Sequence, residues 1–268
     1  MSRTDVTIAV LGLGEAGGAF ARDLREAGAV VRGYDPAVPC DTDSEADAAK
    51  GADLVLSVNS ASASVDALHA GLPGLADGAI WADMNTASPG TKRKLAEIAA
   101  AHEVPFTDVA IMAPVPGRGL AVPMLASGVA ASATAELLAG FGGKVQVMAG
   151  AAGLAAERKL LRSVFFKGMS AAVVEALQAA RAAGCEDWLR EVIVAELTGA
   201  EGSTVDRLVS GTRQHAVRRT AEMAAAAEML GELGVPADVA GAARDQLARL
   251  SSGKSNATKV PRLGEELR

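Results

Sequence analysis

Residues 6–17, VTIAVLGLGEAG, decide the fold of this 268-residue chain. The apolar run 6–11 predicts a buried strand, and the pattern of residues 16–27 predicts a helix. Between them, residues 12–17 form a GxGxxG motif. A strand, this glycine pattern and a helix in that order are typical of the phosphate loop of a dinucleotide-binding βαβ unit.

Each glycine of this loop has its own predicted role. Gly12 permits the tight turn, Gly14 lets a pyrophosphate approach the backbone, and Gly17 lets helix and strand pack closely. The helix N-terminus adds N–H groups and a dipole that stabilise the anion. We therefore assign cofactor binding to the loop formed by Gly12, Leu13, Gly14, Glu15, Ala16 and Gly17. The carboxylate of Glu15 should point away from the pyrophosphate, and the alternative is a glycine-rich turn without a ligand.

Asp35 follows a second apolar run, residues 30–34. A carboxylate at this place can accept hydrogen bonds from both hydroxyls of the adenine ribose, and it repels a 2′-phosphate. Pro36 occupies the position of the usual phosphate-binding arginine, so the sequence favours NAD over NADP. NADP stays open because Arg22 or Arg32 could take that role, and an Asp-Pro turn is the alternative for Asp35.

Apolar runs and helical patterns alternate through the first half of the chain. The predicted strands are residues 6–11, 30–34, 54–58, 80–83, 106–110, 124–127 and 145–148. The predicted helices are residues 16–27, 44–50, 62–70, 91–102 and 133–141. This alternation predicts an α/β fold with a Rossmann-type, doubly wound parallel sheet. The connection from Asp35 to Ala52 is short, so we expect a reduced or missing third strand.

The pattern changes after Gly150, where no convincing strand follows. The predicted helices there are residues 154–183, 187–197, 212–233 and 238–250. We predict a dinucleotide-binding domain over residues 1–150 and a small all-α domain over residues 151–268, which serves substrate binding and dimerisation. A polar tail from about residue 251 should be loosely ordered.

Composition argues against several classes of function. The chain has 32 acidic and 26 basic residues and a net charge of -6, whereas nucleic-acid binders carry a basic excess. Two separated cysteines and three scattered histidines give no disulfide framework and no metal site. The run 6–20 imitates a signal peptide, but its glycines explain it better, and no apolar stretch is long enough to span a membrane. We expect a cytoplasmic protein with a small-molecule substrate and no nucleic-acid, membrane or metal partner.

Three further stretches complete a family pattern. Residues 83–89 are DMNTASP, residues 108–114 are DVAIMAP, and residues 150–163 are GAAGLAAERKLLRS. Together with the glycine loop and Asp35, they resemble the β-hydroxyacid dehydrogenases, the group of 3-hydroxyisobutyrate and 6-phosphogluconate dehydrogenases. This chain looks like a branch of that group with a short helical domain.

The resemblance implies that Lys159 is the catalytic residue. Interconverting an alcohol and a ketone by hydride transfer needs a group that takes the hydroxyl proton in one direction and returns it in the other. Ser163 lies one helical turn further along and stands where the family has an asparagine. We therefore expect its hydroxyl to hydrogen-bond to the substrate. The alternative for Lys159 is a solvated lysine on a helix surface.

Other residues at the expected strand ends and helices complete the candidate site. Asn85 and Thr86 can contact the nicotinamide ribose or the substrate, and Ser57, Val58 and Asn59 should lie along the cofactor. The substrate-side candidates are Met112, Ala113, Pro114, Arg162, Lys167 and His215. The family's Ser-Gly-Gly is replaced by Met112, Ala113 and Pro114, so the substrate is where the resemblance is weakest. His215 and Arg219 are four residues apart, so we expect them to share a helix face and form an anion clamp. For the charged candidates the alternative is an ordinary solvated surface.

The sequence thus predicts an NAD(P)-dependent oxidoreductase that transfers a hydride between nicotinamide and a small hydroxy or keto acid, and that forms a homodimer. One alternative is an imine or enamine reductase on a related fold, although such enzymes usually lack the lysine. The other is a non-catalytic dinucleotide-sensing module, which would keep the three glycines without needing Lys159 or Thr86.

Overall fold

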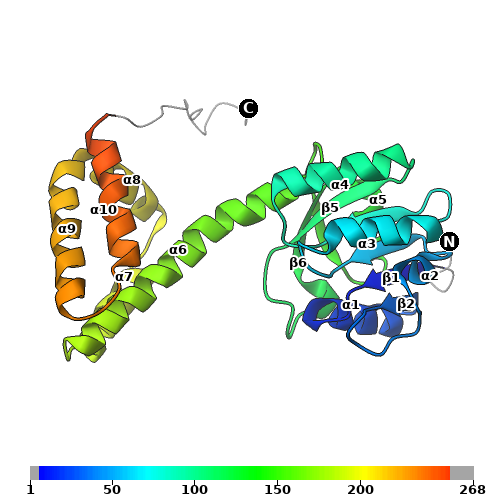
Figure 1. Ribbon diagram of the computed structural model, residues 1–268, viewed down its shortest axis with the longest axis horizontal. Helices are drawn as coiled ribbons and strands as arrows, with labels where there is room; N and C mark the ends of the chain where they lie inside the picture. The colour runs from blue at the N-terminus through cyan, green and yellow to red at the C-terminus, as the bar shows by residue number, and fades with distance from the viewer. Residues whose placement is uncertain (1–5, 254–268) are drawn as a thin grey trace. The chain divides into compact units, whose positions relative to one another are not determined.

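Seven strands form one sheet in the first part of the chain. The computed structural model describes residues 6–253 (Figure 1). The strand order in the sheet is β2-β1-β3-β4-β5-β6-β7. The strands are β1 (Thr7–Leu11), β2 (Val30–Tyr34), β3 (Leu54–Ser57), β4 (Ile80–Asp83), β5 (Phe106–Ile111), β6 (Pro123–Ser127) and β7 (Lys144–Val147). All seven lie close to the predicted ranges, because each is an apolar run bounded by turn residues.

The strands β1 to β5 are parallel, and β6 and β7 run in the opposite direction. The doubly wound sheet is therefore confirmed, with a reversal that the alternation of strands and helices did not indicate. Its physical reason is the connection between β5 and β6. A parallel pair needs a long crossover, whereas this connection holds only the short 3-10 turn η3 (Gly119–Ala121), so the chain returns antiparallel.

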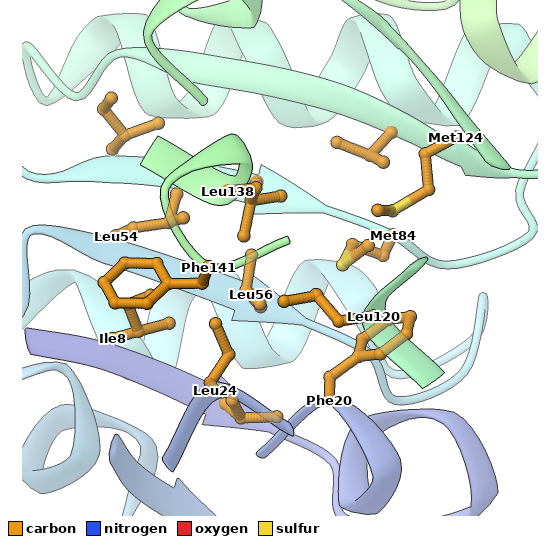
Figure 2. Packing of buried hydrophobic residues seen from close by; sticks show 14 of the residues in the cluster. Ile8, Phe20, Leu24, Leu54, Leu56, Met84, Leu120, Met124, Leu138 and Phe141 are labelled. Atoms are coloured by element: carbon orange, nitrogen blue, oxygen red, sulfur yellow. The ribbon is translucent and has the colours of Figure 1, made fainter. Parts of the chain in front are cut away.

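Helices cover both faces of the sheet. Side chains alternate along a strand, so Ile8 and Val10 belong to one core and Ala9 and Leu11 to the other. The helices are α1 (Glu15–Glu26), α2 (Glu45–Ala49), α3 (Ser64–Gly71), α4 (Pro89–Ala101) and α5 (Ala131–Ala139), with the 3-10 turn η2 (Leu72–Gly74). The helices α1 and α5 cover the first face, and α2, α3 and α4 cover the second. Figure 2 shows the first core, with Ile8, Phe20, Leu24, Leu54, Leu56, Met84, Leu120, Met124, Leu138 and Phe141.

The expected loss of a strand after β2 is confirmed. Between Asp35 and Ala52 the chain forms the short helix α2, whose N-cap is Ser44, and no strand. β2 is consequently an edge strand of the sheet. This stretch is too short for the helix and strand that a complete mononucleotide-binding half would add.

After β7, the described residues form helices joined by short turns, and they contain no further strand. They form α6 (Leu154–Ala182), α7 (Glu186–Thr198), α8 (Gly202–Gln214), α9 (Ala216–Glu232) and α10 (Asp238–Ser251). The chain divides into two compact units between Ser163 and Val164, within α6. The predicted tail beyond residue 253 lies outside the described residues.

Two expectations for the second unit are wrong. The predicted helix 212–233 is interrupted at His215: residues 212–214 end α8, and the rest is α9. The part of α8 before residue 212 was not predicted. The glycines of α8 suggested loops, but a capping box starts this helix despite them. The Glu201 side chain accepts from the backbone N–H of Thr204, and the Thr204 hydroxyl accepts from the Glu201 N–H at 2.9 Å.

The second unit has a small core of its own. Ala179, Leu230 and Ala240 bring α6, α9 and α10 together. Glu175 of α6 caps α10, since its carboxylate accepts from the backbone N–H groups of Val239 at 2.7 Å and Ala240 at 2.8 Å. None of the helices in residues 6–253 combines the length and apolar character that crossing a bilayer requires.

Candidate active site

A row of buried polar side chains crosses the sheet where β3 and β4 end. Ser57, Asp83, Asp108 and Ser127 are partners in the register of four neighbouring strands, β3 to β6. All four residues have no exposed surface. Buried polar groups need hydrogen-bond partners. Ligands of open α/β sheets bind at this edge, so the partners of these four side chains lie next to the expected ligand site.

Lys92 of α4 is the centre of this row. Its ammonium donates to Asp83 Oδ1 at 2.5 Å and to the Asp83 carbonyl at 2.8 Å, and it lies 3.1 Å from Asp108 Oδ1. All three side chains are 0% exposed. An ion pair removed from water in this way needs further hydrogen bonds to its remaining polar atoms, and two neighbouring elements supply them.

The N-terminus of α6 supplies the first set of these bonds. Asp108 Oδ2 accepts from the backbone N–H groups of Gly153 and Ala156, both at 3.0 Å. Ser127 Oγ accepts from the Ala155 N–H at 3.1 Å and donates to Asp108 Oδ2 at 3.3 Å. The positive end of the helix dipole stabilises the Asp108 carboxylate, and the two side chains fix where α6 starts.

Gly153 is required at this start. It has a φ of +103°, and a Cβ there would lie 2.9 Å from the carbonyl oxygen of Pro89, the first residue of α4. A side chain at position 153 would therefore force the starts of α4 and α6 apart.

Asn85 supplies the second set. Its Nδ2 donates to Asp83 Oδ2 at 2.8 Å, to Asn59 Oδ1 at 2.9 Å and to Ser57 Oγ at 3.2 Å. These bonds join the segments that follow β3 and β4. The residue is buried, and within the described part of the protein its Oδ1 finds no hydrogen-bond donor.

The structure brings Lys159 to Thr86. The Lys159 ammonium donates to Thr86 Oγ1 at 2.7 Å, where Thr86 stands exposed just beyond β4. Lys159 is half-buried, as is Ser163 one turn further along α6, while Arg162 is exposed. A lysine and a hydroxyl from distant parts of the sequence thus meet at the ligand-binding edge of the sheet.

The glycine loop fits a dinucleotide. A Cβ on Gly12, whose φ is +93°, would lie 2.7 Å from the Val58 carbonyl oxygen, and one on Gly17 would lie 1.8 Å from the Gly12 carbonyl oxygen. A Cβ on Gly14, by contrast, would meet nothing within 4 Å. Gly14 is the N-cap of α1, and no side chain caps this helix, so its first-turn N–H groups are available to a pyrophosphate.

Asp35 is held beside this loop. Its Oδ2 accepts from the Leu13 N–H at 2.7 Å, and its Oδ1 accepts from the Ala37 N–H at 2.8 Å. Asp35 therefore starts a turn and is also fixed in place, with further lone pairs on both oxygens for ribose hydroxyls. The neighbouring Tyr34 has a pKa raised above its usual value, chiefly by the charge of Glu45, so its phenol is neutral at physiological pH.

The other candidate residues of the first unit lie in the loop after β5 and around the glycine loop. Met112, Ala113 and Pro114 follow β5, where the Met112 N–H donates to the Pro123 carbonyl at 2.9 Å. Glu15 is exposed, and Ala16 and Val58 are half-buried around the glycine loop.

Two candidates, Lys167 and His215, belong to the second unit. His215 lies between α8 and α9, which corrects the expectation of one helix that carries both His215 and Arg219. Arg219 donates to Thr212 Oγ1 at 2.7 Å, so its guanidinium already has a partner in the fold.

Sequence reasoning missed Lys92 and Ser127. Lys92 had a detectable signal, because it shares the buried face of α4 with Leu95 and Ala99 and interrupts an otherwise apolar stripe. Ser127 had none, since a serine at the end of a strand is common. No cluster of three or more metal-ligating side chains of His, Cys, Asp or Glu occurs in residues 6–253.

The fold and the glycine loop define an NAD(P)-binding protein with a dehydrogenase-type Rossmann fold. The chain belongs to the family of the NAD binding domain of 6-phosphogluconate dehydrogenase, whose model matches residues 7–150. A second model, a domain of unknown function called DUF1932, matches residues 180–250. The resemblance to hydroxyacid dehydrogenases is thereby confirmed. No curated protein matches the chain significantly.

Solved structures agree with this assignment. A conserved hypothetical protein from Sinorhizobium meliloti 1021 is 31% identical, with a TM-score of 0.60 over 97% of this chain and 92% of that one. MTH1747, a conserved protein of unknown function with structural similarity to 3-hydroxyacid dehydrogenases, is 25% identical, with a TM-score of 0.60 over 93% and 98% of the two chains. An imine reductase from Streptomyces aurantiacus has a TM-score of 0.78 at 19% identity, over 92% and 95%, and shares the fold.

Gly14→Ala should separate cofactor binding from folding. The added methyl meets no protein atom, so the melting temperature should stay near that of the wild type, but it enters the space left for the pyrophosphate. The affinity for NAD, measured by calorimetry, should fall about tenfold or more, which is about 1.4 kcal/mol. The matched control is Gly231→Ala in α9, which also meets nothing. Unchanged affinity in Gly14→Ala would show that the anion does not bind this loop.

Proposed function

We propose that this protein is an NAD(P)-dependent oxidoreductase that acts on the CH–OH or C=O group of a small hydroxy or keto acid in the cytoplasm. The observation that carries the proposal is the 2.7 Å hydrogen bond between Lys159 Nζ and Thr86 Oγ1 at the carboxyl edge of the sheet. A lysine at this position can exchange a proton with the hydroxyl of a substrate. A module that only binds the cofactor does not need such a group.

Each residue has a distinct task in this proposal. Nicotinamide, when bound, supplies the chemistry of hydride transfer. Lys159 takes the proton from the substrate hydroxyl in the oxidising direction and returns it in the reducing direction. Thr86 orients the lysine by accepting its hydrogen bond, and its own hydroxyl hydrogen stays available to the substrate or the ribose.

The acid group of the substrate needs cationic or polar partners. Arg162 and Ser163 lie within one turn of Lys159 on α6, and Met112, Ala113 and Pro114 form the loop beyond β5. We assign substrate binding to these residues. We also propose Lys167 and His215, which belong to the second unit, as anion-binding residues.

Lys159→Met should lower turnover by orders of magnitude and retain cofactor binding. Methionine has a similar shape but no proton to exchange, so kcat should fall about 10²–10⁴-fold. The dissociation constant for NAD should change by less than about threefold, because Lys159 is not part of the glycine loop. Lys144→Met, at an exposed position of β7, is the control. Near-normal kcat in Lys159→Met would refute the role.

The substrate class is tested by a screen that follows the absorbance of the reduced nicotinamide. Hydroxy and keto acids form one arm, and cyclic imines or ketone–amine pairs form the other. Turnover in the first arm supports the proposal, and turnover only in the second assigns an imine or enamine reductase. Tight cofactor binding without turnover in either arm favours the dinucleotide-sensing module.

We further propose a preference for NAD over NADP, which rests on the fixed carboxylate of Asp35. Asp35→Asn keeps an oxygen for the Leu13 N–H and removes the charge that repels a 2′-phosphate. The ratio of the NAD and NADP affinities should shift toward NADP by about tenfold, roughly 1.4 kcal/mol. The exposed Asp43→Asn is the control. An unchanged ratio would contradict the assignment.

We propose that the active form is a homodimer built on the second unit. Among its described residues the buried apolar side chains are mostly alanines, namely Ala179, Ala180, Ala216, Leu230, Ala240 and Leu247. Many large apolar side chains are instead exposed: Val164, Phe165, Phe166, Val174, Trp188, Val192, Val194, Leu197, Val205, Leu208, Val209, Val217 and Met229. Exposed apolar surface on this scale is typical of an interface.

The second unit also contains an apolar groove of about 490 Å³, formed by α6, α7, α9 and α10. Its lining combines seven alanines with larger apolar side chains such as Trp188, Met229 and Leu230. A symmetric pair of such units would cover the groove and the exposed side chains of both copies.

Trp188→Glu should dissociate the dimer. Trp188 is 63% exposed, and a buried, unpaired charge at a dimer interface is strongly unfavourable. Light scattering should give twice the 27.0 kDa chain mass for the wild type and the mass of one chain for the variant. Val129→Glu, at a 91% exposed position of the first unit, should stay dimeric. A monomeric wild type would overturn the proposal.

A further inference from the structure

We propose that Lys92 is a positioning residue for Lys159: by bridging Asp83 and Asp108, it fixes the Lys159 ammonium against Thr86. This inference builds on the proposed function, because it concerns the same lysine. Lys92 itself is fully buried, and its ammonium pairs with the carboxylates of Asp83 and Asp108, through which it acts.

The first carboxylate controls the Thr86 side of the contact. Asp83 Oδ2 accepts from Asn85 Nδ2 at 2.8 Å, and Asn85 is the residue before Thr86. Asn85 also donates to Asn59 at 2.9 Å, so its place is fixed jointly by Asp83 and by the segment after β3. The position of Thr86 therefore depends on that of Asp83.

The second carboxylate controls the Lys159 side. Asp108 Oδ2 accepts from the N–H groups of Gly153 and Ala156, and Ser127 Oγ accepts from that of Ala155. Lys159 lies on the next turn of the same helix. An α-helix is stiff over so short a distance, so moving its capped end moves Lys159 as well.

Lys92 is the group that holds the two carboxylates together. Its ammonium lies 2.5 Å from Asp83 Oδ1 and 3.1 Å from Asp108 Oδ1. Without this charge two neighbouring carboxylates would be buried side by side, where they repel each other or one must take up a proton. Repulsion would separate β4 from the start of α6, and protonation would replace the ammonium bridge by a pair with a different geometry. We infer that both changes shift Thr86 relative to Lys159.

A purely structural role makes a different prediction. If Lys92 only stabilises the fold, a variant that still folds should retain both kcat and the environment of the Lys159 ammonium. If it positions Lys159, a folded variant should lose alignment at this one ammonium while cofactor binding persists.

The experiment compares Lys92→Met and Ser127→Ala with the exposed Lys94→Met of α4 as the control. Ser127→Ala is the milder change, because it removes one cap of α6 and leaves the buried ion pair intact. Should Lys92→Met fail to fold, Ser127→Ala tests the support of α6 through which Lys92 is proposed to act. Ser127→Thr keeps the hydroxyl and should restore wild-type behaviour.

Two measurements are made on the full chain. With the substrate found in the screen, kcat should fall about tenfold or more in Lys92→Met and in Ser127→Ala, while KM for NAD stays within about twofold. Without substrate, reductive methylation with labelled formaldehyde gives an NMR signal for Lys159, identified by its absence from Lys159→Met. That signal should move toward the position of exposed lysines in both variants and stay in place in Lys94→Met.

The NMR measurement keeps the two proposals distinguishable. If no substrate is turned over, the proposed function fails, yet a shifted Lys159 signal still supports the positioning role. Folded variants with wild-type kcat and an unmoved Lys159 signal would overturn it. A wild-type signal in Ser127→Ala would also overturn it where Lys92→Met does not fold.

Discussion

The fully buried ion pair between Lys92 and the carboxylates of Asp83 and Asp108 ties the first unit together at its functional edge. It joins two neighbouring strands of the sheet, β4 and β5, to α4, which covers the second face. Because charges inside a protein are tolerated only when they are paired and hydrogen-bonded, the bonds to Asn85 and to the N-terminus of α6 are needed as well. The two residues of the candidate active site follow directly from these bonds: Thr86 is next to Asn85, and Lys159 lies on α6.

The two helix N-termini of the site are used in opposite ways. The N–H groups at the start of α6 donate to the side chains of Asp108 and Ser127. The helix is thereby fixed and supports Lys159. α1 begins at Gly14 with no side-chain cap, and a Cβ there would meet open space. One helix end is thus closed by the fold and the other is open to an anion, which is why the cofactor is expected at α1 and catalysis beside α6.

Much of the fold was predictable because it rests on local signals. Apolar runs, the glycine loop and the helical patterns gave every strand and all helices of the first unit to within a few residues, and the short stretch after Asp35 indicated the lost strand. The errors have local causes too. The capping box of Glu201 and Thr204 outweighed the glycines of α8, and His215 divides what was expected to be one helix.

The sequence by itself determined the dinucleotide-binding class, because glycines at fixed spacing after a strand leave few other conformations, and it singled out Lys159 and Thr86 as separate candidates. Only the tertiary structure decided that these two side chains meet, and that Lys92 stands between the carboxylates on which both depend. The physical reason is that pattern and propensity act over a few neighbouring residues. Hydrogen bonds between β4, α4, β5, β6 and α6 exist only once the sheet has brought those segments together.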